Sequence, residues 1–265
     1  MGQNGDVKPV VLITGASAGL GRAIALRFAQ GGYRVVAVAR GKEKLDSLAT
    51  EVGAFADVAT LAIDAGEASA PSRAVTTALE RFGRIDCLIN NAGSGRWGKV
   101  HETDDAMLDE VIDLGLKAPL RFAREAIPHM KPGSSIIGVG SAWGVIGGMG
   151  GGVYCAVKAS QVGLTRSLAT DYGPLGIRAN LIAPGVIRTD MTDAIWESDY
   201  FQRINQEVTP FNREGTPEDV SETAFFLATQ PGSFINGQVI ALDGGWSTAK
   251  YIAPQALFAE RVPQG

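Results

Sequence analysis

The chain has 265 residues, enough for one large domain or at most two small ones. Its 24 Lys+Arg and 28 Asp+Glu give a net charge of −4, which argues against a nucleic acid or an anionic membrane as its main partner. Hydrophobic residues make up 45% and charged residues 20%, which excludes a disordered chain and predicts a sizeable core. The 34 glycines lack the collagen period, so we expect them where the backbone turns sharply or approaches another group.

The sequence also argues against several specialised classes of protein. Cys87 and Cys155 are too few for a disulfide scaffold and match no CxxC spacing, and two histidines are too few for a zinc site, so we expect no metal. Residues 132–157 are uncharged, but nine glycines interrupt them, so we expect a strand and a loop rather than a membrane span. Residues 1–9 lack a signal-peptide pattern, which predicts a soluble cytoplasmic protein.

Short β-branched runs alternate with longer helical patterns, which is typical of a parallel sheet built from βα units. We expect strands at residues 10–13, 34–39, 60–63, 85–90, 135–139, 177–182 and 238–242. We expect the main helices at residues 20–30, 42–52, 69–82, about 103–130, 153–172 and from 216 onward. This order predicts an α/β, Rossmann-type, doubly wound sheet in a single domain, 1–265, with helices on both faces and a ligand at the carboxyl edge. The irregular stretch at about 186–214 is expected to form a substrate lid.

The first turn reads Thr-Gly-Ala-Ser-Ala-Gly-Leu-Gly over residues 14–21. A glycine-rich turn from a strand into a helix aims backbone N–H groups and the helix dipole at a phosphate. Gly15 permits the tight turn, Gly19 lets a pyrophosphate approach, and Gly21 brings helix and strand together. The spacing is G-x-x-x-G-x-G rather than G-x-G-x-x-G, and the alternative is a merely tight turn.

A second pattern is Tyr154 and Lys158, which lie four residues apart and therefore on one face of a helix. A nearby ammonium favours the phenolate, so we expect it to lower the pKa of the tyrosine and make Tyr154 a general acid/base. Alone, such a pair is equally typical of a helix surface. However, Ser141 follows a buried strand, and Asn90 to Gly93 follow another, so these groups are expected to meet at one edge of the sheet.

Together these residues resemble the short-chain dehydrogenase/reductase family, in its ordinary-length single-domain branch, from about residue 10 to residue 245. The elements occur in the family's order: TGxxxGxG at 14–21, Asp64, NNAG at 90–93, Ser141, YxxxK at 154–158, PG at 184–185, and DGG at 243–245. The resemblance implies that Tyr154 exchanges the proton, Ser141 hydrogen-bonds the substrate oxygen, and Lys158 holds the nicotinamide ribose and lowers the pKa of the tyrosine.

The resemblance also implies a set of cofactor-binding residues, with Asp64 near the adenine, Asn91 near the adjoining ribose and Thr189 near the carboxamide. The complete set is Gly15, Ser17, Gly19, Leu20, Gly21, Arg40, Asp64, Asn91, Ala92, Gly93, Tyr154, Lys158, Pro184, Gly185, Ile187 and Thr189.

One position departs from the family. The family has an Asn in the long central helix, which holds a water that links the lysine to solvent, and Gly115 stands there in this chain. The substitution puts the proton relay in doubt, although a water could fill the space that the missing side chain leaves. It affects neither hydride transfer nor the tyrosine.

The end of the second strand bears on the coenzyme. An acidic residue there binds the ribose hydroxyls and repels a 2′-phosphate, but this chain has Arg40. A guanidinium suits a phosphate, and Ser17 could add a hydroxyl, so NADP(H) is favoured. The alternative is a solvated Arg40 stacked on adenine, with NAD(H) still used.

Large apolar side chains are the candidates for substrate contact, namely Trp97, Trp143, Met149 and Trp196. They suit a nonpolar carbonyl compound under a lid that excludes water. For Trp196, packing in the local core or a subunit contact is the alternative. No Arg or Lys is clearly aimed at the site, so an acyl-thioester substrate is neither indicated nor excluded.

These observations predict an NADP(H)-dependent oxidoreductase that interconverts a secondary alcohol and a ketone, acting as a ketone reductase or alcohol dehydrogenase. The alternative is a dinucleotide-binding regulatory or scaffold subunit with little activity, which Gly115 suggests. The family commonly forms dimers or tetramers, and the apolar residues 251–258 suit such a contact, so a homotetramer is expected.

Overall fold

Seven parallel strands form one sheet in the computed structural model, which describes residues 8–189 and 192–248. The strands are β1 Val10–Thr14, β2 Arg34–Ala39, β3 Val58–Ala62, β4 Cys87–Asn90, β5 Ser135–Val139, β6 Arg178–Pro184 and β7 Val239–Leu242. Their spatial order is β3-β2-β1-β4-β5-β6-β7, so the chain moves outward from β1 and then returns to the other side of it. This reversal confirms the doubly wound α/β prediction.

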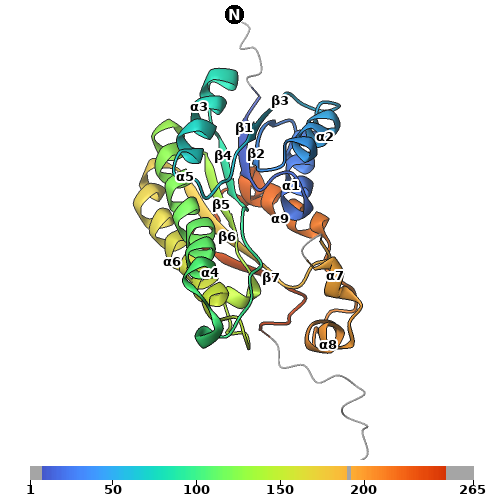
Figure 1. The fold of residues 1–265 in the computed structure, drawn as a ribbon. Coiled ribbons are helices and arrows are strands. Elements are labelled where there is room, and N and C mark those ends of the chain that lie inside the picture. Colours follow the sequence, from blue (N-terminus) through green and yellow to red (C-terminus); the bar gives the residue numbers. More distant parts are fainter. Residues whose placement is uncertain (1–7, 190–191, 249–265) are drawn as a thin grey trace, which may run out of the picture.

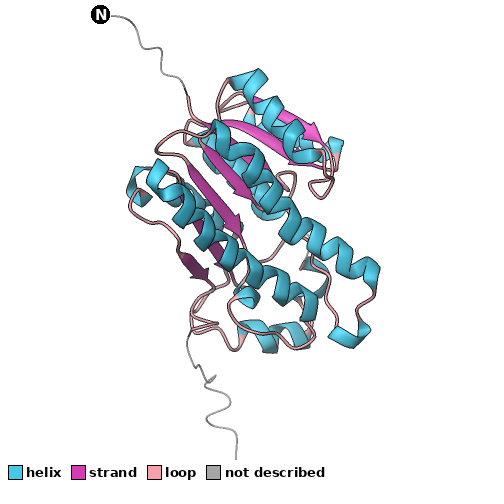
Figure 2. Ribbon diagram, turned by 90° about the vertical axis from the view of Figure 1, so that its left-hand side faces the viewer, coloured by secondary structure: helices cyan, strands magenta, loops and turns pink. Residues whose placement is uncertain are grey.

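Helices cover both faces of this sheet (Figure 1). The helices are α1 Gly19–Gln30, α2 Lys42–Val52, α3 Ala70–Phe82, α4 Asp105–Ile112, α5 Ala118–Ala126, α6 Gly152–Tyr172, α7 Asp193–Trp196, α8 Asp199–Phe201 and α9 Pro217–Ala228. Helices α1, α2 and α9 lie on one face and α3, α4, α5 and α6 on the other (Figures 1 and 2). The short helices α7 and α8 lie apart from the sheet, in the segment predicted to be irregular.

The strands alternate their side chains between two hydrophobic cores. Val11 and Ile13 of β1 pack in the core that includes Phe28 of α1, whereas Leu12 packs in the core that includes Phe122 of α5. All of these side chains are fully buried. Burial on both faces explains why the strand reads as a continuous apolar run. It also fixes which loops reach the carboxyl edge.

The helix predicted at about 103–130 is divided in the structure. Between α4 and α5 the chain forms one π-helical turn, Asp113–Lys117, and Gly115 is the buried residue of that turn. The carbonyl of Gly115 accepts a hydrogen bond of 2.7 Å from Nε2 of Gln161 on α6. Widened turns of this kind are frequent at functional sites.

The space beside Gly115 is filled. A Cβ added to Gly115 would lie 2.4 Å from Cγ1 of Val157 on α6, a distance at which something must move. Val157 therefore occupies the volume into which a side chain at position 115 would project. A valine methyl group thus occupies the position of that Cβ and leaves no room there for the water that could have replaced the missing side chain.

Two sequence predictions concern other parts of the chain. Residues 251–258, expected in a subunit contact, lie outside the described residues. Among the helices within 8–189 and 192–248, none combines the length and the hydropathy that a membrane crossing needs.

We predict that Gly115→Asn lowers the free energy of unfolding by about 1–3 kcal/mol, because the new side chain overpacks against Val157. In a Val157→Ala background, Gly115→Asn should lower the free energy of unfolding by less than it does in the parent. Urea denaturation of the parent, the two single variants and the double variant measures this difference. Gly163→Asn is the matched control, since it lies on α6 with nothing within 4 Å of an added Cβ. An equal cost in both backgrounds would contradict this packing argument.

Candidate active site

The glycine-rich turn after β1 has the form of a phosphate cradle. Gly15 and Gly19 have φ of +67° and +50°, values that residues other than glycine rarely adopt. A Cβ on Gly21 would lie 2.1 Å from the carbonyl oxygen of Gly15, so only glycine lets α1 begin so close to the turn. Helix α1 starts after Ala18 without a side-chain cap, which leaves its first N–H groups to another acceptor.

Asn91, after β4, holds this turn in place. Its Nδ2 donates hydrogen bonds of 3.1 Å to the carbonyls of both Thr14 and Gly15. The hydroxyl of Thr14 in turn accepts hydrogen bonds of 3.0 Å from the backbone N–H groups of Asn91 and Ala92. The amide of Asn91 is thus committed to the backbone of the turn, whereas the resemblance implied a place near a ribose.

The turn opens into a cavity of about 540 Å³ at the carboxyl edge of the sheet. Predicted cofactor residues on its walls are Gly15, Ser17, Gly19, Leu20, Arg40, Asp64, Asn91, Ala92, Gly93, Tyr154, Lys158 and Thr189. Gly21 is buried behind the turn. Gly185 and Ile187 lie on a different cavity, and Pro184 ends β6 beside Leu242. The structure therefore brings twelve of the sixteen predicted residues together.

One end of this cavity is basic. Nη1 of Arg40 lies 3.8 Å from Oδ2 of Asp64, and the Arg40 side chain is 80% exposed. Lys44, on the first turn of α2, lines the same cavity and also the adjoining one that contains Ser17 and Arg22. Lys44 is not among the residues predicted from the sequence, although it lies only four residues after Arg40, at the same end of the sheet.

Tyr154, Lys158 and Ser141 converge at the other end. Both members of the helical pair line the cavity, and Nζ of Lys158 lies 5.8 Å from the centre of the Tyr154 ring. Ser141 lies two residues beyond the end of β5 and hydrogen-bonds the side chain of Tyr154. Lys158 is buried, and its Nζ donates a 3.2 Å hydrogen bond to the carbonyl of Val139, the last residue of β5.

The pKa of the tyrosine shifts against expectation. Burial raises the pKa of Tyr154, and the hydrogen bond with Ser141 only partly offsets that effect. Burial also lowers the pKa of Lys158 to about 8. The expectation that the ammonium of Lys158 lowers the pKa of Tyr154 is wrong for this structure, because desolvation dominates. Because its pKa lies above the ordinary value of a tyrosine, Tyr154 keeps its proton at neutral pH.

Three tryptophans continue from Tyr154 in an aromatic row, which we define as Tyr154, Trp97, Trp143 and Trp246. The ring centres are 5.4 Å apart for Tyr154 and Trp97, 5.6 Å for Trp97 and Trp143, and 4.5 Å for Trp143 and Trp246. Of the predicted candidates, Trp97 thus lies beside Tyr154, and Trp143 lies next to Trp97 in the row. Trp246 was missed, although it follows the strand that ends before Asp243 and so had to lie at the same edge.

The other two substrate candidates lie differently. Met149 is 79% exposed, and its carbonyl accepts a 3.1 Å hydrogen bond from Nε1 of Trp97. Trp196 is 2% exposed and packs against Phe201 with ring centres 5.3 Å apart. Trp196 thus belongs to the core of its own segment, with one side on a second cavity.

This second cavity, of about 790 Å³, lies between the segment after β6 and the end of β7. Gly185, Ile187 and Trp246 are among its lining residues. Trp246 also belongs to the aromatic row, so the row leads from the first cavity to the second.

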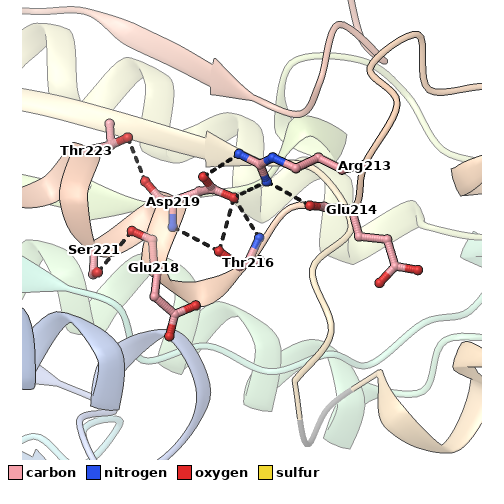
Figure 3. A network of polar contacts seen from close by, with 7 residues as sticks. All are labelled: Arg213, Glu214, Thr216, Glu218, Asp219, Ser221 and Thr223. Atoms are coloured by element: carbon pink, nitrogen blue, oxygen red, sulfur yellow. Dashed lines mark hydrogen bonds and ion pairs between the residues drawn. The ribbon is translucent and has the colours of Figure 1, made fainter.

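A network at the start of α9 fixes one wall of the second cavity (Figure 3). Arg213 donates hydrogen bonds of 2.7 and 2.8 Å to the two carboxylate oxygens of Asp219. Thr216 and Asp219 also form a capping box, in which each side chain accepts a backbone N–H of the other. The guanidinium of Arg213, helped by Thr216, lowers the pKa of Asp219 to about 2. The pair therefore stays charged at physiological pH, and the wall stays tied to α9.

The walls of the first cavity fit a nicotinamide dinucleotide. The glycine turn fits a pyrophosphate, since it brings the uncapped N-terminus of α1 to the cavity, and the basic end lies beside it. The phenol and ammonium lie at the opposite end, where a reactive ring would have to be placed.

Comparisons with known proteins identify the family of the chain. A family model described as enoyl-(acyl carrier protein) reductase matches residues 15–247. The 3-oxoacyl-[acyl-carrier-protein] reductase FabG of Thermotoga maritima is 36% identical over 239 residues, which cover 89% of this chain and 96% of that protein. Meso-2,3-butanediol dehydrogenase of Serratia marcescens is 35% identical over 237 residues, which cover 89% and 93%.

Solved structures are similar over the same region. A short-chain dehydrogenase/reductase from Serratia marcescens superposes with a TM-score of 0.86 at 30% identity, covering 90% of this chain and 98% of that one. A short-chain dehydrogenase from Burkholderia cenocepacia in complex with NADP gives 0.86 at 29% identity, covering 91% and 98%. Motifs, sheet order and these matches agree, and the chain belongs to the short-chain dehydrogenase/reductase family of oxidoreductases.

Proposed function

We propose that the chain interconverts a ketone and a secondary alcohol with NADP(H), with Tyr154 as general acid/base. The observation that carries the proposal is the convergence of Ser141, Tyr154 and Lys158 at one end of a cavity whose other end is a phosphate cradle. Two relatives are named for related chemistry, the reduction of an oxo group and the dehydrogenation of a diol.

The bound nicotinamide would supply or take up the hydride, and the side chains would handle the proton. Tyr154, whose raised pKa keeps it protonated, would give its proton to the carbonyl oxygen during reduction. Ser141 would orient that oxygen by a hydrogen bond. Lys158, anchored on Val139, would carry positive charge at neutral pH and hold the ribose hydroxyls.

The segment at about 186–214 would act as a lid. Its Thr189 lies across the glycine turn, 3.4 Å from where a Cβ of Gly19 would stand, so the segment already meets the first cavity. Closure over the site would exclude water from hydride transfer.

Gly115 favours the regulatory-subunit alternative, but the catalytic groups argue against it. Burial of the Lys158 ammonium costs folding free energy. A protein that only binds a dinucleotide has no need of a lysine, a phenol and a serine at one point. We therefore propose an enzyme whose proton relay avoids position 115.

We predict that Tyr154→Phe lowers kcat for ketone reduction by about 100-fold or more, because the proton donor is lost. The fall in NADPH absorbance measures turnover, and NADPH fluorescence should show unchanged coenzyme binding. Tyr172→Phe, at the end of α6, is the matched control and should leave turnover intact. Near-normal turnover of Tyr154→Phe would exclude Tyr154 as the acid, and tight NADPH binding without turnover of any ketone by the parent would support the binder.

We predict that Arg40→Ala raises the KM for NADPH by about tenfold and leaves the KM for NADH nearly unchanged, because a charge-assisted contact with the 2′-phosphate is lost. Steady-state kinetics with both coenzymes measure the ratio, and Arg73→Ala, an exposed cation on α3, serves as control. Equal changes with the two coenzymes would show that Arg40 does not read the phosphate.

A further inference from the structure

The aromatic row shows what kind of ketone the site would accept. Its four rings come from four separate segments: α6, the loop after β4, the loop after β5 and the chain after β7. Contacts at 4.5–5.6 Å in tilted or T-shaped geometry are the arrangement that aromatic rings prefer. Such convergence from distant parts of the chain makes one continuous aromatic wall.

Glycines let the indole rings lie directly on the backbone. An added Cβ would lie 2.5 Å from the Trp143 ring at Gly148, and 2.9 and 2.7 Å from the Trp97 ring at Gly150 and Gly151. The hydrogen bond from Nε1 of Trp97 to the carbonyl of Met149 fixes the orientation of that indole further. The wall is therefore held in position before a ligand arrives, which lowers the entropic cost of binding.

The wall is also open to a ligand. Trp97 is 44% exposed, and Trp143 and Trp246 are only partly buried. At one end Tyr154 lines the first cavity, and at the other Trp246 lines the second. A molecule with its carbonyl at Tyr154 thus has the aromatic wall alongside it and space beyond.

Two arginines that neighbour the aromatic row and the lid segment in sequence, Arg96 and Arg188, are paired with carboxylates. Arg96 lies 3.9 Å from Glu110, and Arg188 donates hydrogen bonds of 2.9 and 3.1 Å to Asp193 and Glu197. The carboxylates partly offset the charge of these two arginines, and the wall itself consists of uncharged rings, so it favours an uncharged group.

We propose that the aromatic row is the specificity wall of this site and selects ketones that carry an aromatic ring, with the ring packed against Trp97 and Trp143. The proposal rests on the proposed function for the place of the carbonyl, but its evidence is the geometry of the indoles. An aliphatic chain of equal size would fill the same space without the favourable ring-to-ring contacts.

The test compares 4-phenylbutan-2-one with 4-cyclohexylbutan-2-one, whose rings have equal carbon counts and lie equally far from the carbonyl. We predict that the parent has the higher kcat/KM for the phenyl ketone. In Trp97→Leu the ratio of kcat/KM for the phenyl ketone to that for the cyclohexyl ketone should fall by about 2- to 12-fold, because one aromatic pair is lost. Trp143→Leu should lower it too. Phe55→Leu, an exposed aromatic after α2, is the matched control and should leave the ratio unchanged.

Calorimetric binding of both ketones to the protein saturated with NADP⁺ gives a second readout that needs no turnover. Tighter binding of the phenyl ketone, lost in Trp97→Leu, supports the specificity wall even if no ketone is reduced, in which case the proposed function alone fails. Turnover of both ketones with equal affinities, or a preference that persists in both tryptophan variants, would overturn the inference while leaving the proposed function intact.

Discussion

The hydrogen bond between the buried ammonium of Lys158 and the carbonyl of Val139 is the contact on which the site depends. A buried charge needs a partner, and here the partner is the last residue of a central strand. This bond fixes the start of α6 against the end of β5 and therefore places Tyr154 beside Ser141. Every role assigned to the phenol follows from that placement.

The parallel sheet extends the same constraint to the rest of the site. All seven strands run in one direction, so the loops after β1, β2, β4, β5, β6 and β7 reach one edge. The phosphate cradle, the basic end, the phenol and the aromatic row are products of that single arrangement. The chain assembles a cavity at this edge from segments as far apart in sequence as Gly15 and Thr189.

The sheet and the glycine turn were predictable because local patterns determine them. Strand β2 and helix α2 have the predicted bounds, since burial on both faces and capping glycines leave few alternatives. Contacts between distant residues were not predictable in this way. The sequence does not show that Val157 packs against Gly115, or that burial raises the pKa of Tyr154.

The aromatic candidates show the same limit. Trp97, Trp143 and Trp196 look alike in sequence, but the first two belong to the row that starts at Tyr154 and the third packs against Phe201. Only the three-dimensional fold distinguishes a side chain that can meet a substrate from one that packs its own segment. Trp246 could have been found from the sequence by asking which residues follow the last strand. The carboxyl ends of parallel strands meet at one edge of the sheet, and Trp246 follows such an end.

A crystal structure of the protein with NADP⁺ tests the central claim most directly. The account predicts the pyrophosphate on the turn at 14–21, the 2′-phosphate beside Arg40 and Lys44, and the nicotinamide in contact with Tyr154 and Lys158. A dinucleotide bound elsewhere, or one whose nicotinamide ring lies out of contact with Tyr154, would contradict it.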